Sequence, residues 1–238
     1  MTKKSASGGS SGRGRTQKLR KSKGRKESST RWLKRQLSDP YVAEAKEKGL
    51  RSRAAFKLMD LDDRFHFLEP GGRVVDLGAA PGGWTVVAAD RVNSLGLNNG
   101  ANKGKQGRVV GMDLQDADPV AGATLIRHDF MDDEAPGLLK DALQGPADVV
   151  LSDMAAPATG HAATDHLRVM ALLETAFDFA LEVLAPGGAF VGKAFKGGTE
   201  NELLAKMKKR FATVKHAKPP SSRKESAETY VVAQGFKG

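Results

Sequence analysis

The chain has 238 residues, no cysteine and a formal net charge of +10, from 38 Lys and Arg against 28 Asp and Glu. This length fits one domain of ordinary size with an appendage. Without cysteine, a disulfide framework and a thiolate metal site are excluded, and five scattered histidines form no metal-ligand pattern. No apolar run is long enough to cross a bilayer and no signal peptide is evident, so we expect a cytoplasmic protein that does not enter a membrane.

The positive charge is concentrated at the beginning of the chain. Residues 1–30 hold ten Lys and Arg and a single acid, Glu27, which leaves the other 208 residues near +1. This segment is rich in Ser and Gly and buries too little apolar surface to offset the entropy of ordering. We therefore predict a disordered basic arm over 1–30, which either binds RNA phosphates or keeps the protein soluble. One domain is expected over 31–238.

Within that domain, an N-terminal helical segment over 31–72 is expected to face RNA, and a flexible insertion is expected over 93–107. Hydrophobic periodicity predicts helices at 41–48, 51–65, from 84 onward, 167–184 and 200–211. Strands are expected at 73–77, 108–112, 124–127, 148–152, 189–194, 213–217 and 229–234, the last two as an antiparallel hairpin. This alternation predicts an α/β fold of parallel βαβ units, with seven strands in all.

A glycine-rich turn connects the first strand to its helix. Residues 78–83 read Gly-Ala-Ala-Pro-Gly-Gly, whereas a dinucleotide-binding turn would read G-x-G-x-x-G. Pro81 lacks the N–H donor that a pyrophosphate would need. The turn therefore predicts either a ligand without phosphates, bound close to the backbone, or a simple strand-to-helix connection.

Charged residues mark the carboxyl ends of the strands, where open α/β sheets bind their ligands. Asp113 is suited to bind ribose hydroxyls, and Asp129 to accept from an adenine amino group. Asp76, Asp153 and Lys193 lie at the equivalent ends of other strands. A single Asp there can be a helix cap, but four acids in this order favour a cationic nucleoside such as S-adenosylmethionine. Methyl transfer from S-adenosylmethionine requires an acceptor that lies in line with the methyl group, and a group that takes or steers the acceptor's proton.

Four further motifs carry a resemblance. They are Asp-Leu-Gly-Ala-Ala-Pro-Gly-Gly-Trp (76–84), Ser-Asp-Met-Ala (152–155), Gly-Lys-Ala-Phe (192–195) and Glu-Thr-Tyr-Val-Val-Ala (228–233). From about Tyr41 to the C-terminus the chain resembles the FtsJ/RrmJ family of ribosomal RNA ribose 2′-O-methyltransferases, which use S-adenosylmethionine. The resemblance implies a Rossmann-like class I methyltransferase fold, with a mostly parallel seven-stranded sheet and helices on both faces.

The resemblance also implies a site. The family's catalytic tetrad falls on Lys57, Asp153, Lys193 and Glu228, although the local pattern around Lys57 by itself indicates a solvated helix charge. The implied S-adenosyl-L-methionine contacts are Gly82, Trp84, Asp113, Asp129 and Asp153, together with Asp76, Gly78 and Pro81 of the first strand and turn. No metal site is expected. Where the family usually reads Asp-Met-Ala-Pro-Asn, residues 153–157 read Asp-Met-Ala-Ala-Pro.

The implied substrate is the ribose of a uridine in 23S large-subunit ribosomal RNA, methylated on the assembled 50S subunit. We expect the enzyme to be a monomer. Three alternatives remain at this point: another RNA target (tRNA or an mRNA cap), a ribosome-assembly factor with vestigial catalysis, and a nicotinamide oxidoreductase. The residues also leave open whether Lys193 takes the 2′-hydroxyl proton or stabilises the developing alkoxide as a cation.

Overall fold

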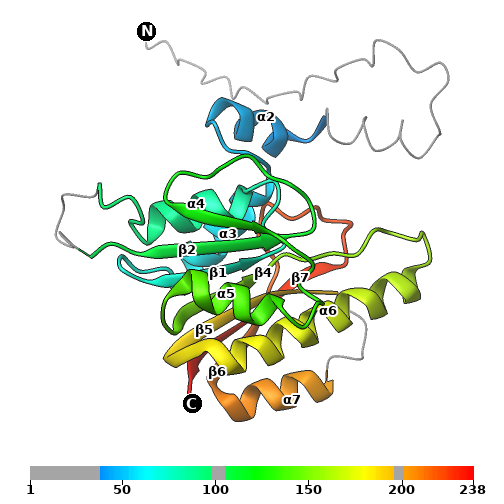
Figure 1. Ribbon diagram of the computed structural model, residues 1–238. Coiled ribbons are helices and arrows are strands. Elements are labelled where there is room, and N and C mark those ends of the chain that lie inside the picture. Colours follow the sequence, from blue (N-terminus) through cyan, green and yellow to red (C-terminus); the bar gives the residue numbers. More distant parts are fainter. Residues whose placement is uncertain (1–37, 98–104, 196–200) are drawn as a thin grey trace, which may run out of the picture.

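The computed structural model describes residues 38–97, 105–195 and 201–238 (Figure 1). The predicted basic arm over 1–30 and the centre of the predicted insertion, 98–104, lie outside the described residues. The described ends of that insertion are joined, because Gln106 Nε2 donates to Ser94 O at 2.7 Å and Asn93 Nδ2 donates to Lys105 O at 3.2 Å.

The described residues form a seven-stranded sheet in the order β3-β2-β1-β4-β5-β7-β6. Its strands are β1 (Arg73–Leu77), β2 (Arg108–Asp113), β3 (Ala123–Arg127), β4 (Ala147–Ser152), β5 (Leu184–Phe195), β6 (Phe211–Ala217) and β7 (Glu228–Phe236). The first five run parallel, and β7 pairs antiparallel with both β5 and β6. The predicted fold class and the C-terminal antiparallel hairpin are confirmed.

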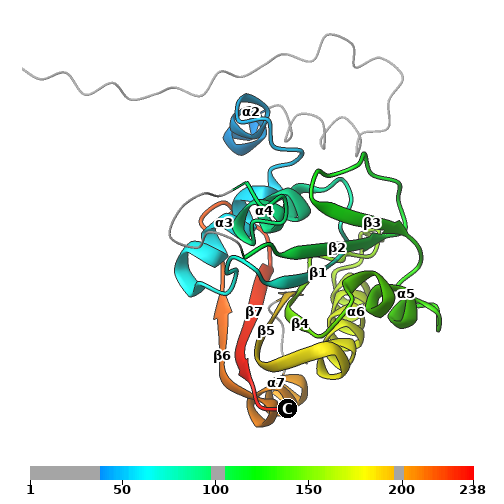
Figure 2. The same cartoon turned by 60° about the vertical axis from the view of Figure 1, so that its left-hand side comes forward.

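Six helices are described: α2 (Pro40–Glu47), α3 (Ala54–Phe65), α4 (Gly83–Arg91), α5 (Ala135–Leu143), α6 (Ala162–Val183) and α7 (Asn201–Arg210). Helices α3 and α4 pack on one face of the sheet, while α5, α6 and α7 pack on the other (Figure 2). Because both faces are covered, the central strands are continuously hydrophobic rather than alternating.

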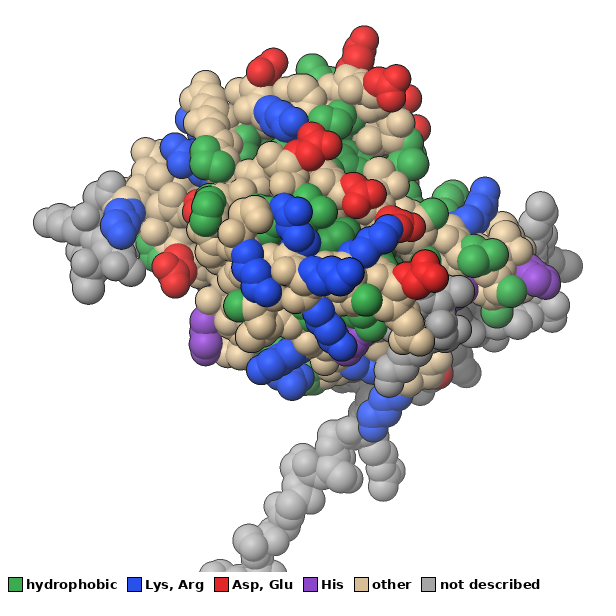
Figure 3. Space-filling model, turned by 90° about the horizontal axis from the view of Figure 1, so that it is seen from below, with side chains coloured by type: hydrophobic (Ala, Val, Ile, Leu, Met, Phe, Trp, Pro, Cys, Tyr) green, Lys and Arg blue, Asp and Glu red, His purple; other side chains and the backbone are tan. Residues whose placement is uncertain are grey.

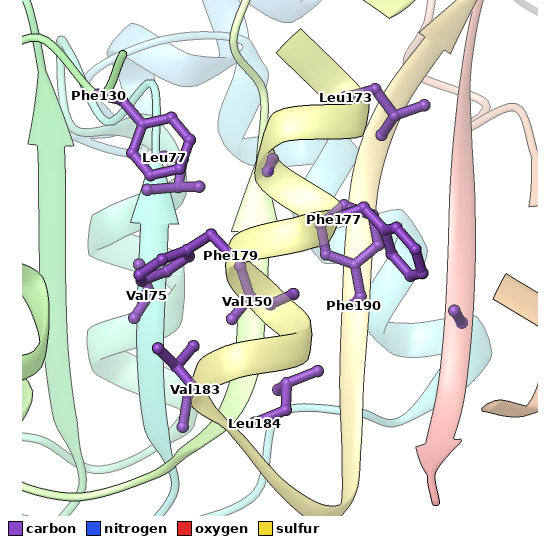
Figure 4. Packing of buried hydrophobic residues seen from close by; sticks show 14 of the residues in the cluster. Val75, Leu77, Phe130, Val150, Leu173, Phe177, Phe179, Val183, Leu184 and Phe190 are labelled. Carbon is purple, nitrogen blue, oxygen red and sulfur yellow. The ribbon is translucent and has the colours of Figure 1, made fainter. Parts of the chain in front are cut away.

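The larger core lies under α6. This helix places an apolar side chain inward at intervals of three or four residues, as an amphipathic helix does. Phe179 and Val183 point towards Val75 and Val150 of the sheet, whereas Phe177 lies beside Phe190, with ring centroids 5.7 Å apart (Figure 4). The rigid sheet that results fixes the strand ends that carry the charged residues.

The structure differs from the predicted elements in several places; for example, α6 begins at Ala162 rather than 167. Helix α5 was not predicted, because Pro136 and Gly137 suggest a loop. Pro136 lies in the first turn of the helix, where backbone N–H groups have no intrahelical acceptor, so proline is tolerated there. Strand β5 begins at Leu184 rather than 189 and includes Pro186-Gly187-Gly188, with an irregular register against β4 between Ala147 and Val149.

None of the helices within the described ranges has the length and apolar character needed to cross a membrane.

Candidate functional site

Strand register brings the predicted charged residues to one edge of the sheet. Leu77 of β1 pairs with Met112 on one side and Ser152 on the other, so the next residues of β1 and β4 leave the sheet together. Asp153 N donates to Leu77 O at 3.1 Å. Ser152 in turn pairs with Gly192, which places Lys193 of β5 beside Asp153. The sheet order reverses between β1 and β4, the kind of position at which α/β proteins bind ligands.

Two buried ion pairs form at this edge. Lys193 Nζ lies 2.8 Å from Asp153 Oδ1 and donates to Asp153 O at 2.7 Å. Lys57 Nζ, from α3, lies 2.8 Å from each of the two carboxylate oxygens of Glu228. Only 8% of either lysine is exposed, so Lys57 is not the solvated charge that its local pattern indicates.

Tyr230 connects the two ion pairs. Its hydroxyl donates to Asp153 Oδ1 at 2.7 Å and accepts from Lys57 Nζ at 3.3 Å. The four residues of the predicted tetrad, 171 positions apart at the extremes, therefore share one hydrogen-bonded cluster. Sequence reasoning missed Tyr230, although it stands inside the quoted 228–233 motif, because only the strand register places it opposite Lys193.

The charges in this cluster set the ionisation of its members. Burial alone would raise the pKa of Asp153, but the Lys193 and Lys57 ammonium groups outweigh it and lower that pKa below its usual value. Burial and the Asp153 and Glu228 carboxylates raise the pKa of Tyr230 well above its usual value. Asp153 is therefore a carboxylate and Tyr230 a neutral hydrogen-bond donor at neutral pH.

The glycine turn packs against the residue after Asp153. Gly78 has φ +80°, and a Cβ added there would meet Met154 N at 2.9 Å, so the turn and the end of β4 fit together only with glycine at this position. Gly82 has φ +100° and contacts Arg51, whose guanidinium donates to the carbonyls of Pro81, Asp118 and Pro119. Arg51 thereby ties the turn to the loop after β2.

Asp113 and Asp129 lie at the ends of β2 and β3. Asp113 accepts from Ala80 N at 2.9 Å and from Gln115 N at 2.8 Å, and it borders a cavity of about 70 Å³ whose walls include Ala79, Leu125 and Ile126. Asp129 Oδ1 accepts from Met131 N at 2.9 Å. Each carboxylate oxygen accepts more than one hydrogen bond, so these contacts leave acceptor capacity for a ligand.

Two of the predicted contact residues have buried side chains. Trp84 is 3% exposed, donates from Nε1 to Ala54 O at 2.8 Å and packs its ring against Tyr230 with centroids 5.4 Å apart. Only its backbone, at the start of α4, remains for a ligand. Asp76 is fully buried, and its Oδ2 accepts from Thr85 Oγ1 at 2.6 Å. Its carboxylate therefore holds α4 against β1.

Asp76 predicts an unusual pH dependence of stability. Burial raises its pKa to about 7, and Oδ1 has no hydrogen-bond partner among the described residues. The folded state thus binds a proton that the unfolded chain releases near pH 4, so this stabilisation is complete below pH 4 and is lost as the pH rises to 7. Relative to Asp76→Asn, the wild-type free energy of unfolding should fall by roughly 1.4 kcal/mol per pH unit across that window.

Urea denaturation of both proteins at pH 5, 6, 7 and 8 measures this difference. Parallel stability curves for the wild type and the Asn variant would contradict it.

A second network joins α2 to the site. Asp39, which caps α2, accepts from Arg223 at 3.1 Å and lies 3.2 Å from Arg53 Nε. Ser222 Oγ donates to Glu228 Oε1 at 3.0 Å, so the loop over 218–226 contacts the Lys57–Glu228 pair directly. A cavity of about 460 Å³ lies between this loop and the beginning of α2, with Tyr41 among its lining residues.

Within the described parts of the chain, no group of three or more His, Asp or Glu side chains is arranged to hold a metal ion. The cluster at the strand ends is instead a set of two cations, two carboxylates and a phenol.

Comparison with known proteins identifies the family of this chain. A family model described as FtsJ-like methyltransferase matches residues 50–236. The ribosomal RNA large subunit methyltransferase E of Rhodospirillum rubrum is 63% identical over 221 residues, which is 93% of this chain and 81% of the relative. Its namesake from Parvibaculum lavamentivorans is 56% identical over 245 residues, 100% of this chain and 96% of the relative.

A crystal structure from Plasmodium falciparum, named as a ribosomal RNA methyltransferase, is 30% identical and superposes with a TM-score of 0.67 over 79% of this chain and 99% of that chain. The family model covers most of the chain, and both bacterial relatives are nearly full-length matches. The resemblance found in the motifs is therefore confirmed: the chain belongs to the FtsJ-like methyltransferase family and is a methyltransferase.

Proposed function

We propose that this protein transfers the methyl group of S-adenosylmethionine to the ribose 2′-hydroxyl of a uridine in 23S large-subunit ribosomal RNA, on the assembled 50S subunit. The observation that carries the proposal is the cluster of Lys57, Asp153, Lys193 and Glu228 at the carboxyl edge of the sheet, connected through Tyr230. Relatives over nearly the whole chain named as ribosomal RNA large subunit methyltransferases support the choice of RNA.

The residues around Asp113 fit the proposed donor. A carboxylate beside the apolar walls of Ala79, Leu125 and Ile126 suits the ribose and base of a nucleoside, whereas it would repel a phosphate. Asp113 would hold the ribose hydroxyls and Asp129 the adenine edge. The backbone of the glycine turn from Gly78 to Trp84, which includes Pro81 and Gly82, would contact the rest of S-adenosylmethionine. When bound, S-adenosylmethionine supplies an electrophilic methyl group on a sulfonium.

The lysines act on the acceptor oxygen. A lysine ammonium has three donors, and Lys193 directs two of them at Asp153 O and Oδ1. The third is left for the 2′-oxygen. Asp153 fixes the direction of Lys193, while Glu228 and Tyr230 fix Lys57 as a second cation near the same position. As an ammonium, Lys193 would stabilise the negative charge that develops on this oxygen. As a neutral amine, it would keep two N–H donors on Asp153 and accept the 2′-hydroxyl proton on its lone pair.

Mapping ribose methylation tests the proposal. Large ribosomal subunits from cells lacking this protein, naked large-subunit ribosomal RNA and tRNA would each be incubated with the purified enzyme and radiolabelled S-adenosylmethionine. We expect one uridine 2′-O-methyl group, formed fastest on subunits. Labelling of tRNA instead would redirect the enzyme to another RNA, and no labelling of any RNA by the folded protein would indicate an assembly factor. A ribosomal RNA substrate would locate the reaction in the cytoplasm, and we expect a monomer by sedimentation.

A further inference from the structure

One edge of the molecule combines unusual charge with a direct connection to the tetrad. Residues 203–224 contain eight Lys and Arg and no Asp or Glu. The rest of 31–238 holds 20 Lys and Arg against 27 Asp and Glu, so it is net acidic. The acid-free segment covers most of α7, the whole of the edge strand β6 and the loop that reaches Glu228.

We define the basic edge as five exposed cations on α7, β6 and the residue after β7: Lys208, Lys209, Arg210, Lys215 and Lys237. Figure 3 views this edge from below and shows Lys and Arg side chains gathered in the middle of that face. None of the five forms an ion pair with an acid among the described residues. One turn earlier in α7, by contrast, Lys206 lies 2.9 Å from Glu174, so the neighbouring surface does balance its charge.

The fold brings these like charges together. Phe211 pairs with Phe236 at the beginning of the β6–β7 ladder, so Arg210 and Lys237 emerge side by side, with Lys237 N donating to Arg210 O at 2.9 Å. Lys237 Nζ donates to Lys209 O at 3.2 Å. Like charges held this close together repel one another. An uncompensated cluster therefore indicates a partner that supplies negative charge.

Two ordinary explanations account for part of this pattern. Cations in the last turn of α7 interact favourably with the helix dipole, and lysines on edge strands prevent edge-to-edge aggregation. Neither explains why acids are missing from the whole stretch, nor why it continues into the 218–226 loop, whose Ser222 donates to Glu228.

We infer that the basic edge is a second RNA-binding surface, which holds phosphates of the substrate several nucleotides away from the methylated ribose. The seven residues of β6 span roughly 23 Å at about 3.3 Å per residue. A nucleic acid strand in a helix carries one phosphate per ~3.4 Å, so this length matches about seven nucleotides. The partner is thus a folded RNA with a segment that extends from the tetrad along β6 to the end of α7.

This inference rests on the proposed RNA substrate, and the two are tested separately. The edge variant carries Lys208→Gln, Lys209→Gln and Lys215→Gln, which remove three charges but keep polar side chains on the edge. The matched control carries Arg73→Gln, Arg108→Gln and Lys140→Gln, three exposed cations on β1, β2 and α5. Binding of naked large-subunit ribosomal RNA is measured at 50 to 200 mM salt, together with S-adenosylmethionine affinity and the temperature of unfolding.

The edge variant should bind this RNA about 10- to 100-fold more weakly at 150 mM salt, and the slope of log affinity against log salt should fall by roughly 2 to 3. S-adenosylmethionine affinity and unfolding temperature should stay at wild-type values. An unchanged slope in the edge variant, or an equal loss in the control, would overturn the inference. Failure of the proposed function would look different, because the wild-type protein itself would then methylate no ribosomal RNA.

Discussion

Replacement of Lys193 by Ala should lower the rate of methyl transfer by roughly 10²–10⁴-fold, the usual contribution of a side chain that moves or holds a proton in the transition state. Lys193 directs two of its donors at Asp153, at 2.7 and 2.8 Å. Asp153 holds Lys193 through its backbone oxygen and its carboxylate, whereas Lys57 pairs with Glu228. S-adenosylmethionine affinity should remain near the wild-type value, because the side chain acts on the acceptor oxygen.

Single-turnover methyl transfer and calorimetric binding of S-adenosylmethionine measure the two quantities. Lys193→Met keeps most of the apolar stem of this buried side chain and separates loss of chemistry from loss of packing. Lys140→Ala, which removes an exposed lysine paired with Glu182, is the control and should retain full activity. Turnover within a few-fold of wild type in both Lys193 variants would remove this residue from the chemistry.

The pH–rate profile distinguishes the two roles proposed for Lys193. If Lys193 accepts the proton, the rate of methyl transfer should rise with pH, because the lysine must first lose its own proton. A cation that stabilises the alkoxide gives a rate that falls as the lysine is deprotonated.

Asp153→Ala should damage both stability and function. Asp153 accepts from Tyr230 and holds Lys193, and the two ammonium groups keep it ionised by lowering its pKa. Removing one member of a buried ion pair leaves the other without compensation and costs about 3–5 kcal/mol. The variant should therefore unfold at a lower urea concentration and lose methyl transfer, and S-adenosylmethionine affinity should fall, since Asp153 directly follows the strand end against which the glycine turn packs.

The sign of the pH dependence provides an independent check. A carboxylate whose pKa is lowered by folding stabilises the protein above pH ~4, and that contribution is lost as the pH falls further. The stability gap between wild type and Asp153→Ala should therefore shrink below pH 4. Asp153→Asn keeps an oxygen for Tyr230 but not the charge, so its free energy of unfolding should lie between those of the wild type and Asp153→Ala. A gap that stays constant down to pH 3 would show that folding does not lower the pKa of Asp153.

Much of the fold could be predicted from local pattern. Strand β1 was predicted over the same residues that form it, and the strands that alternate with helices specified a parallel sheet. The failures have local causes. Pro136 and Gly137 concealed α5, since proline in a first helical turn is compatible with the helix. Pro186-Gly187-Gly188 suggested a break within what became the beginning of β5, where the ladder to β4 is irregular.

The candidate site shows the same division. Acids at strand ends can be found by counting from each predicted strand, because parallel strands all end at one edge. Lys57 could not be found this way. Its neighbours on α3 are ordinary core residues, and its ion-pair partner Glu228 lies 171 residues away. Tyr230 looked like an ordinary buried strand aromatic until the register against β5 set it opposite Lys193.

By itself the sequence determined that this is an α/β protein with a glycine-rich turn after its first strand, and its motifs pointed to a methyltransferase. Only the tertiary structure decided that two lysine–carboxylate pairs meet through one phenol, that Asp76 is sealed inside the fold, and that five cations share one edge of the sheet. The physical reason is that composition and periodicity are properties of neighbouring residues, whereas strand register and helix packing bring distant residues into contact.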